Sequence, residues 1–151
     1  LQWKKNITVP KAGYAFLPSE FPKGTLMVTG FNAAPIFGKG GIYLGSVLSD
    51  EDPVQLTDAV DWPNEVTVAP KNMFGETDFP AVVVGAGFLV PTHPTGGVWV
   101  LEASTDPAVL KDGPVKITTD LGGWFYHVGE FLDMNGDGHL DIVTARGSGQ
   151  T

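Results

Sequence analysis

The chain has 151 residues, a formal charge of -8 and no cysteine. Its length fits one domain of ordinary size, and the lack of cysteine excludes disulfide scaffolds and thiol chemistry. The acidic balance argues against nucleic acid as a partner, and no apolar run approaches the roughly 20 residues of a membrane helix. The chain starts at Leu1 without a signal-like segment, which predicts a processed chain or a fragment.

The residue composition favours short strands joined by turns. The chain contains 20 Gly and 12 Pro, and only 17% of its residues are charged. This mixture is poor in the residues that fill helices, while 42% hydrophobic residues suffice for a packed core. No window has a sustained 3.6-residue apolar period, so we expect almost no helix.

A long-period repeat runs along the chain. The segment Trp3–Val9 returns as Trp62–Val68 and, more loosely, as Trp124–Val128, at offsets of 59 and 62 residues. Three further pairs of segments recur in the same order: Thr25–Gly30 with Pro80–Gly85, Gly40–Leu44 with Gly96–Val100, and Pro53–Asp58 with Pro114–Asp120. We therefore predict repeats at about residues 3–61, 62–123 and 124–151, the third incomplete.

Each repeat contains four short runs of β-branched or aromatic residues bounded by turn residues. In the second repeat these predict strands at about Glu65–Ala69, Ala81–Gly85, Gly97–Ala103 and Val115–Thr119. Four strands in a tandem unit of 50–60 residues are typical of a β-propeller blade, whereas the alternative, a β-sandwich, does not explain the repeat. The fold class is thus all-β, with about two and a half blades. Closed propellers need roughly four to eight, so we expect other copies or other chains to complete a larger propeller.

The strongest chemical signal is the run Asp133-Met134-Asn135-Gly136-Asp137-Gly138-His139-Leu140-Asp141. Oxygen-bearing side chains stand at positions one, three, five and nine, and crowding three carboxylates in one loop is costly unless a cation neutralises them. Gly136 and Gly138 allow a positive φ, which brings the oxygens to a common centre. The backbone carbonyl of His139 would add the seventh position. Hard oxygen ligands favour calcium, with manganese or magnesium as substitutes.

Two other interpretations of this loop were weighed. An EF-hand needs a bidentate Glu at position twelve, where this chain has Thr144, and helical flanks, where Val128–Phe131 and Ile142–Ala145 have the pattern of strands. A simple Asn-Gly or Asp-Gly hairpin turn would bind no metal, but it gains nothing from aspartates at both ends.

The run Phe131–Val143 resembles the FG-GAP/VCBS repeat of integrin-α-like β-propellers, whose blades carry D-x-N-x-D-G-x-x-D between their first two strands. The resemblance implies one structural calcium ion, held by the side chains at 133, 135, 137 and 141. The second repeat places Phe74 and Pro80 at ligand positions, and the first has only Pro22–Gly24 there. We therefore expect one calcium site in this chain.

Other candidate residues give weaker signals. The aromatic residues that recur in phase could stack on sugars, but a packing role is the stronger expectation: Trp3, Trp62, Trp124, Tyr43 and Trp99. Asn6-Ile7-Thr8 is a glycosylation sequon that matters only in a secreted eukaryotic protein. The acidic run Asp50–Asp52 is expected to be a solvated turn. His93, His127 and His139 have no metal spacing, and no catalytic or organic-cofactor residue can be nominated.

Two functions follow as expectations. The first is an extracellular or secreted, calcium-binding module, non-enzymatic and used at a cell surface for adhesion, for carbohydrate binding or for structural assembly. Its ligand would be a glycan or a protein. The alternative is the propeller domain of a carbohydrate-active enzyme of the polysaccharide lyase or sugar dehydratase type, since propellers that resemble this family also occur there. A pocket with converging acid and base groups would favour the enzyme.

Overall fold

A computed structural model gives the fold. It describes residues 9, 12–16, 18, 21–30, 40–76, 80–87, 96–104, 113–119, 123–127 and 129–148. Within these residues every regular element is a β-strand paired antiparallel to its neighbour, and none is a helix. The prediction of an all-β chain is therefore confirmed.

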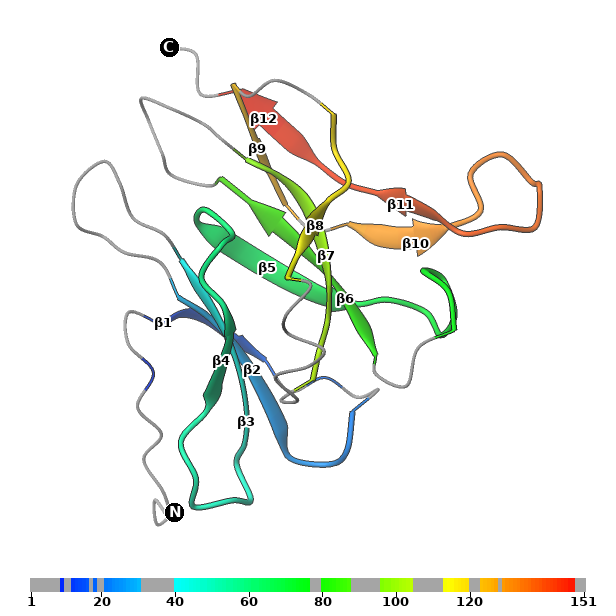
Figure 1. The fold of residues 1–151 in the computed structure, drawn as a ribbon. Coiled ribbons are helices and arrows are strands. Elements are labelled where there is room, and N and C mark those ends of the chain that lie inside the picture. The colour runs from blue at the N-terminus through cyan, green and yellow to red at the C-terminus, as the bar shows by residue number, and fades with distance from the viewer. Residues whose placement is uncertain are drawn as a thin grey trace, which may run out of the picture.

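Two four-stranded sheets form the larger part of the molecule (Figure 1). In each, the strands pair in chain order, so each sheet is an antiparallel meander. The first contains β1 (Ala12–Phe16), β2 (Thr25–Gly30), β3 (Gly41–Ser46) and β4 (Val54–Thr57). The second contains β5 (Pro63–Val68), β6 (Ala81–Ala86), β7 (Gly97–Glu102) and β8 (Val115–Lys116). All four strands predicted for the second repeat are therefore present.

A long two-stranded hairpin follows the second sheet. Its base pairs β9 (Trp124–Tyr126) with β12 (Arg146–Ser148), and its outer half pairs β10 (Glu130–Leu132) with β11 (Asp141–Val143). Between the two halves, His127 N donates to Ala145 O at 2.9 Å. The flanks of the Asp-rich run are thus strands, as predicted, and the run itself forms the tip of the hairpin.

Strand pairing corrects one of the sequence matches. Gly30 pairs with Gly41 in the first sheet, and Ala86 pairs with Gly97 in the second. The counterpart of Thr25–Gly30 is therefore Ala81–Ala86, one residue later than the match made from sequence. The three consecutive valines of β6 make either alignment look similar, but a slip of one residue would exchange the two faces of the strand.

The first strand of the first sheet also differs from the sequence match. β1 pairs with β2, and both β1 and β5 carry a one-residue bulge at the same place relative to their partner strands. The structural counterpart of β5 is therefore β1 and not Trp3–Val9, of which residues 3–8 lie outside the described part of the chain. The hydrogen-bonded register of the strands shows that β1 corresponds to β5, and the sequence alone does not reveal that register.

The second sheet is buried on both faces. One face packs on the first sheet around a cluster of buried side chains: Met27, Ile42, Leu44, Leu56, Val60, Val66, Val82, Val84, Ala86, Leu101 and Ala103. The opposite face packs on the hairpin around Ala69, Val83, Val98 and Tyr126. Because side chains alternate along a strand, Val82 and Val84 enter the first cluster and Val83 enters the second. The near-continuous apolar run of β6 follows from this two-sided burial.

A close approach at an equivalent glycine joins the first sheet to the second and the second sheet to the hairpin. Gly40, just before β3, donates its N–H to Val60 O, and a Cβ built on Gly40 would lie 2.0 Å from Pro63 Cδ. Gly96, at the equivalent place before β7, donates to Trp124 O at 3.1 Å, and its Cβ would lie 2.3 Å from that oxygen. Only glycine allows this close approach. The recurrence of Gly-Gly in the sequence therefore marks where successive units touch.

The recurring aromatic residues divide between packing and surface positions. Trp99 packs against the first cluster, and Trp124 packs against the second with the Arg146 guanidinium 4.3 Å from its ring centre. The expected packing role is confirmed for these two. Trp62 and Tyr43 are half-buried and belong to neither cluster, and Trp3 lies outside the described residues.

Candidate metal centre

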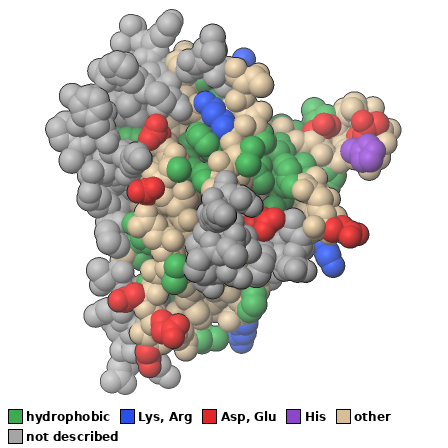
Figure 2. Space-filling model, viewed as in Figure 1, with side chains coloured by type: hydrophobic (Ala, Val, Ile, Leu, Met, Phe, Trp, Pro, Cys, Tyr) green, Lys and Arg blue, Asp and Glu red, His purple; other side chains and the backbone are tan. Residues whose placement is uncertain are grey.

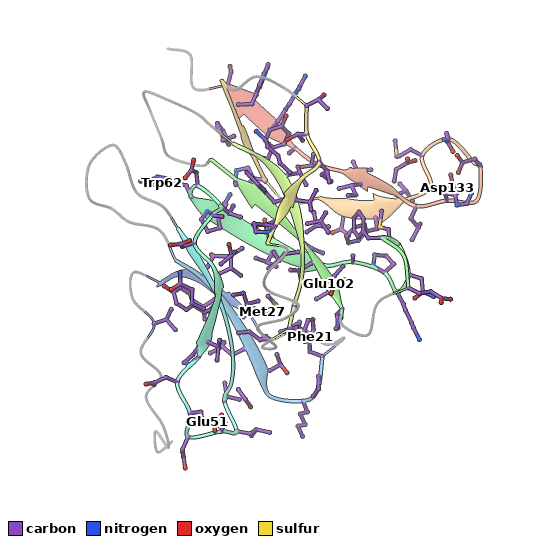
Figure 3. All side chains as sticks on the ribbon, viewed as in Figure 1. Phe21, Met27, Glu51, Trp62, Glu102 and Asp133 are labelled. Atoms are coloured by element: carbon purple, nitrogen blue, oxygen red, sulfur yellow. The ribbon has the colours of Figure 1, made fainter. Side chains whose placement is uncertain are left out.

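The Asp-rich loop projects from the body of the molecule at the tip of the β10–β11 hairpin (Figures 1 and 3). Acidic side chains and a histidine gather on this lobe in the space-filling view (Figure 2). The outer half of the hairpin is anchored, because Phe131 of β10 and Ile142 of β11 pack against the second core cluster. The loop is thus an exposed structure on a fixed support.

The Asp133 carboxylate organises the backbone of the loop. Its Oδ1 accepts hydrogen bonds from Gly136 N at 2.7 Å and Asp137 N at 3.2 Å, and its Oδ2 accepts one from Gly138 N at 2.9 Å. Three N–H groups therefore point at one carboxylate, so the chain must curl around it. This curl holds the backbone of Gly136, Asp137 and Gly138 against the first residue of the loop.

The other predicted side-chain ligands also turn their oxygens into the loop. Asn135 Oδ1 accepts from Asp137 N at 2.9 Å, and Asp137 Oδ1 accepts from His139 N at 2.8 Å. Asp141 Oδ2 accepts from Met134 N at 3.0 Å and so ties the two ends of the loop together. Asn135 Nδ2 donates to Asp137 Oδ2 at 2.9 Å. All four side chains thus take part in one hydrogen-bonded loop.

The two glycines of the loop have the backbone conformation predicted from sequence. Gly136 has φ of 77° and Gly138 has φ of 86°, both in the left-handed region. A Cβ built on either would meet no atom within 4 Å. Glycine is therefore favoured at both positions by backbone conformation and not by lack of space.

Electrostatics keep Asp133 ionised. The hydrogen bond from Gly138 N is the largest cause that lowers the pKa of this carboxyl below its usual 3.8, and the N–H groups of Gly136, Asp137 and Asn135 act in the same direction. Desolvation opposes them by favouring the neutral acid. A carboxylate that stays charged in acid is a suitable cation ligand.

The donor set fits a hard cation. The side chains of Asp133, Asn135, Asp137 and Asp141 offer only oxygen, and an ionised carboxylate has about four lone-pair positions, so accepting N–H groups leaves capacity for a metal. Within the described residues, however, no three His, Asp or Glu side chains are gathered closely enough to form a metal cluster. The loop therefore offers oxygen donors of the right kind, but the structure does not gather its three carboxylates into a metal cluster. The role of the His139 carbonyl stays a prediction.

The equivalent turns of the two sheets differ from this loop. The β5–β6 connection contains left-handed Asn72 and Gly75, with φ of 65° and 101°. Just before β2, a hydrogen bond from Thr25 N to Pro22 O at 3.0 Å closes a turn. The acidic run Asp50–Asp52 is exposed on the β3–β4 turn, and Glu51 lies far from Asp133 (Figure 3), as expected for a solvated turn.

Two features were not found from sequence. Asn64 Nδ2 lies 3.0 Å from His127 Nδ1, which links β5 to the hairpin. A cavity of about 540 Å³ lies between the β5–β6 turn and β10. Each joins residues about 60 positions apart, so no local pattern could have revealed them.

No family model, curated protein or solved structure matches the chain. Within the described residues, no helix is long and apolar enough to cross a membrane.

Proposed function

We propose that the chain is a calcium-binding β-propeller module of the FG-GAP/VCBS type that acts outside the cell. The observation that carries the proposal is the loop from Asp133 to Asp141, in which four oxygen-bearing side chains accept hydrogen bonds from backbone N–H groups of the same loop. Calcium would be held by Asp133, Asn135, Asp137 and Asp141 with the His139 carbonyl. It would offset the repulsion between the carboxylates and fix the tip of the hairpin.

Repetition of the contact between units supports the propeller. The first sheet meets the second at Gly40, and the second meets the hairpin at Gly96, an equivalent position. Successive antiparallel units that pack through equivalent glycines are what radial repetition of blades requires. The hairpin is only two strands wide along its length, whereas each sheet is four strands wide. Other copies or other chains would supply the missing strands and the remaining blades.

The proposed role is non-enzymatic. An exposed calcium loop suits millimolar extracellular calcium, at which weak sites are filled. Such a module would serve adhesion, carbohydrate binding or structural assembly. The alternative proposal, a domain of a carbohydrate-active enzyme, is distinguished by assaying lyase and dehydratase activity on polysaccharides.

Calorimetric titration with calcium tests the proposal. We expect one ion per chain, and Asp137→Ala should abolish binding. Glu51→Ala is the matched control, because it removes one negative charge from an exposed turn outside the loop. Light scattering tests assembly: a compact, stable monomer would contradict an incomplete propeller, and absence of calcium binding would contradict the metal site.

A further inference from the structure

We propose that the cavity between the β5–β6 turn and β10, here called the turn pocket, binds a short neutral oligosaccharide. Its lining consists of Thr67–Gly75, Pro80, Ala81, Glu130 and Phe131. The volume of about 540 Å³ lies within the range of small-molecule sites. The inference deepens the carbohydrate-binding role proposed above and rests on it for the class of ligand.

The floor of the turn pocket is apolar and well supported. Met73, Ala81 and Phe131 pack against the second core cluster, and Ala69 belongs to it. Phe74, on the turn, is 38% exposed. The pocket thus combines a fixed aromatic residue on the hairpin with an accessible one on the turn. An aromatic ring offers its face to the C–H groups of a pyranose, a contact that buries apolar surface on both partners.

The rim of the turn pocket carries free hydrogen-bonding groups. Lys71, Asn72 and Glu130 are exposed, and Thr67 is half-buried. Among the residues that the structure describes, none of these four side chains makes a hydrogen bond or an ion pair. Together they offer ammonium and amide donors, amide and carboxylate acceptors, and a hydroxyl that does both. Ring hydroxyls of a sugar can use donors and acceptors alike.

Charge and polarity select the class of ligand. Among the described lining residues Lys71 is the one cation and Glu130 the one anion, and the whole chain carries a charge of -8, so a sulfated or otherwise strongly anionic ligand is disfavoured. A purely apolar ligand would desolvate the polar groups at the rim without replacing their hydrogen bonds. A neutral, hydroxyl-rich ligand with an apolar face satisfies both conditions.

Saturation-transfer NMR on the full chain tests the inference with cellotriose, maltotriose and N-acetylchitotriose as probes. We expect at least one probe to receive saturation from the protein. The same probe should change chemical shifts of the protein only at residues of the turn pocket. Phe74→Ala should weaken binding roughly tenfold, and Glu130→Gln should weaken it less. Leu48→Ala, on the 72% exposed side chain of another turn, is the matched control and should leave binding unchanged.

Two outcomes would overturn the inference: none of the three probes binds the folded chain at millimolar concentration, or a bound probe is unaffected by Phe74→Ala. Each probe is measured with calcium and with chelator. Sugar binding without calcium binding would refute the metal site and leave the turn pocket standing. Calcium binding without sugar binding would refute the turn pocket and leave the metal site standing.

Discussion

Gly96 is the position at which a single methyl group should most strongly disturb the stacking of units. A Cβ there would lie 2.3 Å from Trp124 O, 2.4 Å from Ala86 O and 2.9 Å from Phe125 Cα. All three atoms belong to the backbone, so no side chain can rotate away. Gly96→Ala must therefore push the hairpin away from the second sheet or displace β6.

The expected cost follows from two contributions. Overpacking costs about 1–3 kcal/mol, and loss of the hydrogen bond from Gly96 N to Trp124 O adds about 1 kcal/mol. We therefore expect Gly96→Ala to lower the free energy of unfolding by about 2–4 kcal/mol. For a chain of this size that corresponds to a fall in Tm of roughly 5–15 °C.

Thermal and urea unfolding followed by circular dichroism measure this change. Gly45→Ala is the graded control, because its Cβ would lie 3.0 Å from Pro53 Cβ and Cγ and 3.1 Å from Pro53 Cα, a less severe approach that a shift of a few tenths of an ångström relieves. We expect it to cost about 1 kcal/mol or less. If Gly96→Ala has the same Tm as the wild type or as Gly45→Ala, the close contact between the second sheet and the hairpin is refuted.

Three further predictions concern the core and the loop. Met27→Ala, at a side chain with no exposed surface, should lower the free energy of unfolding by about 2–5 kcal/mol, whereas Leu48→Ala should change it by less than about 0.5 kcal/mol; urea titration compares them. Because the pKa of Asp133 is lowered by folding, its contribution to stability is present above its unfolded pKa, near 3.8, and is lost as pH falls through the lower folded value. In chelator, Asp133→Asn should therefore destabilise the chain near neutral pH and flatten the acid limb of its Tm profile; superimposable profiles would contradict this. Gly136→Ala should cost about 1 kcal/mol through its positive φ alone, since its Cβ has open space, and an unchanged Tm in chelator would argue against that conformation.

The four-stranded meanders were predictable from sequence, because β-branched runs between Gly and Pro residues mark strands without any knowledge of their neighbours. The register was less accessible. The valine run of β6 fits two alignments, and only the pairing of Ala86 with Gly97 chooses between them. Trp3 looked like the start of the first unit because it matches Trp62, but pairing with β2 makes β1 the counterpart of β5.

The candidate metal loop was also predictable in its local features. Positive φ at Gly136 and Gly138, and strands on both sides, follow from residue types within a few positions. The turn pocket was not predictable, because Phe74 and Phe131 line one cavity only after the hairpin packs on the second sheet. Non-local packing of this kind leaves no periodic signal in the sequence.

The central claim is that the loop from Asp133 to Asp141 binds one calcium ion that stabilises the fold. Its most direct test is the Tm of the wild type, Asp137→Ala and Glu51→Ala, each measured in calcium and in chelator. We predict that chelator lowers the Tm of the wild type and of Glu51→Ala, and that Asp137→Ala melts at the same temperature in both conditions. A wild-type Tm that is the same with calcium and with chelator would contradict the claim.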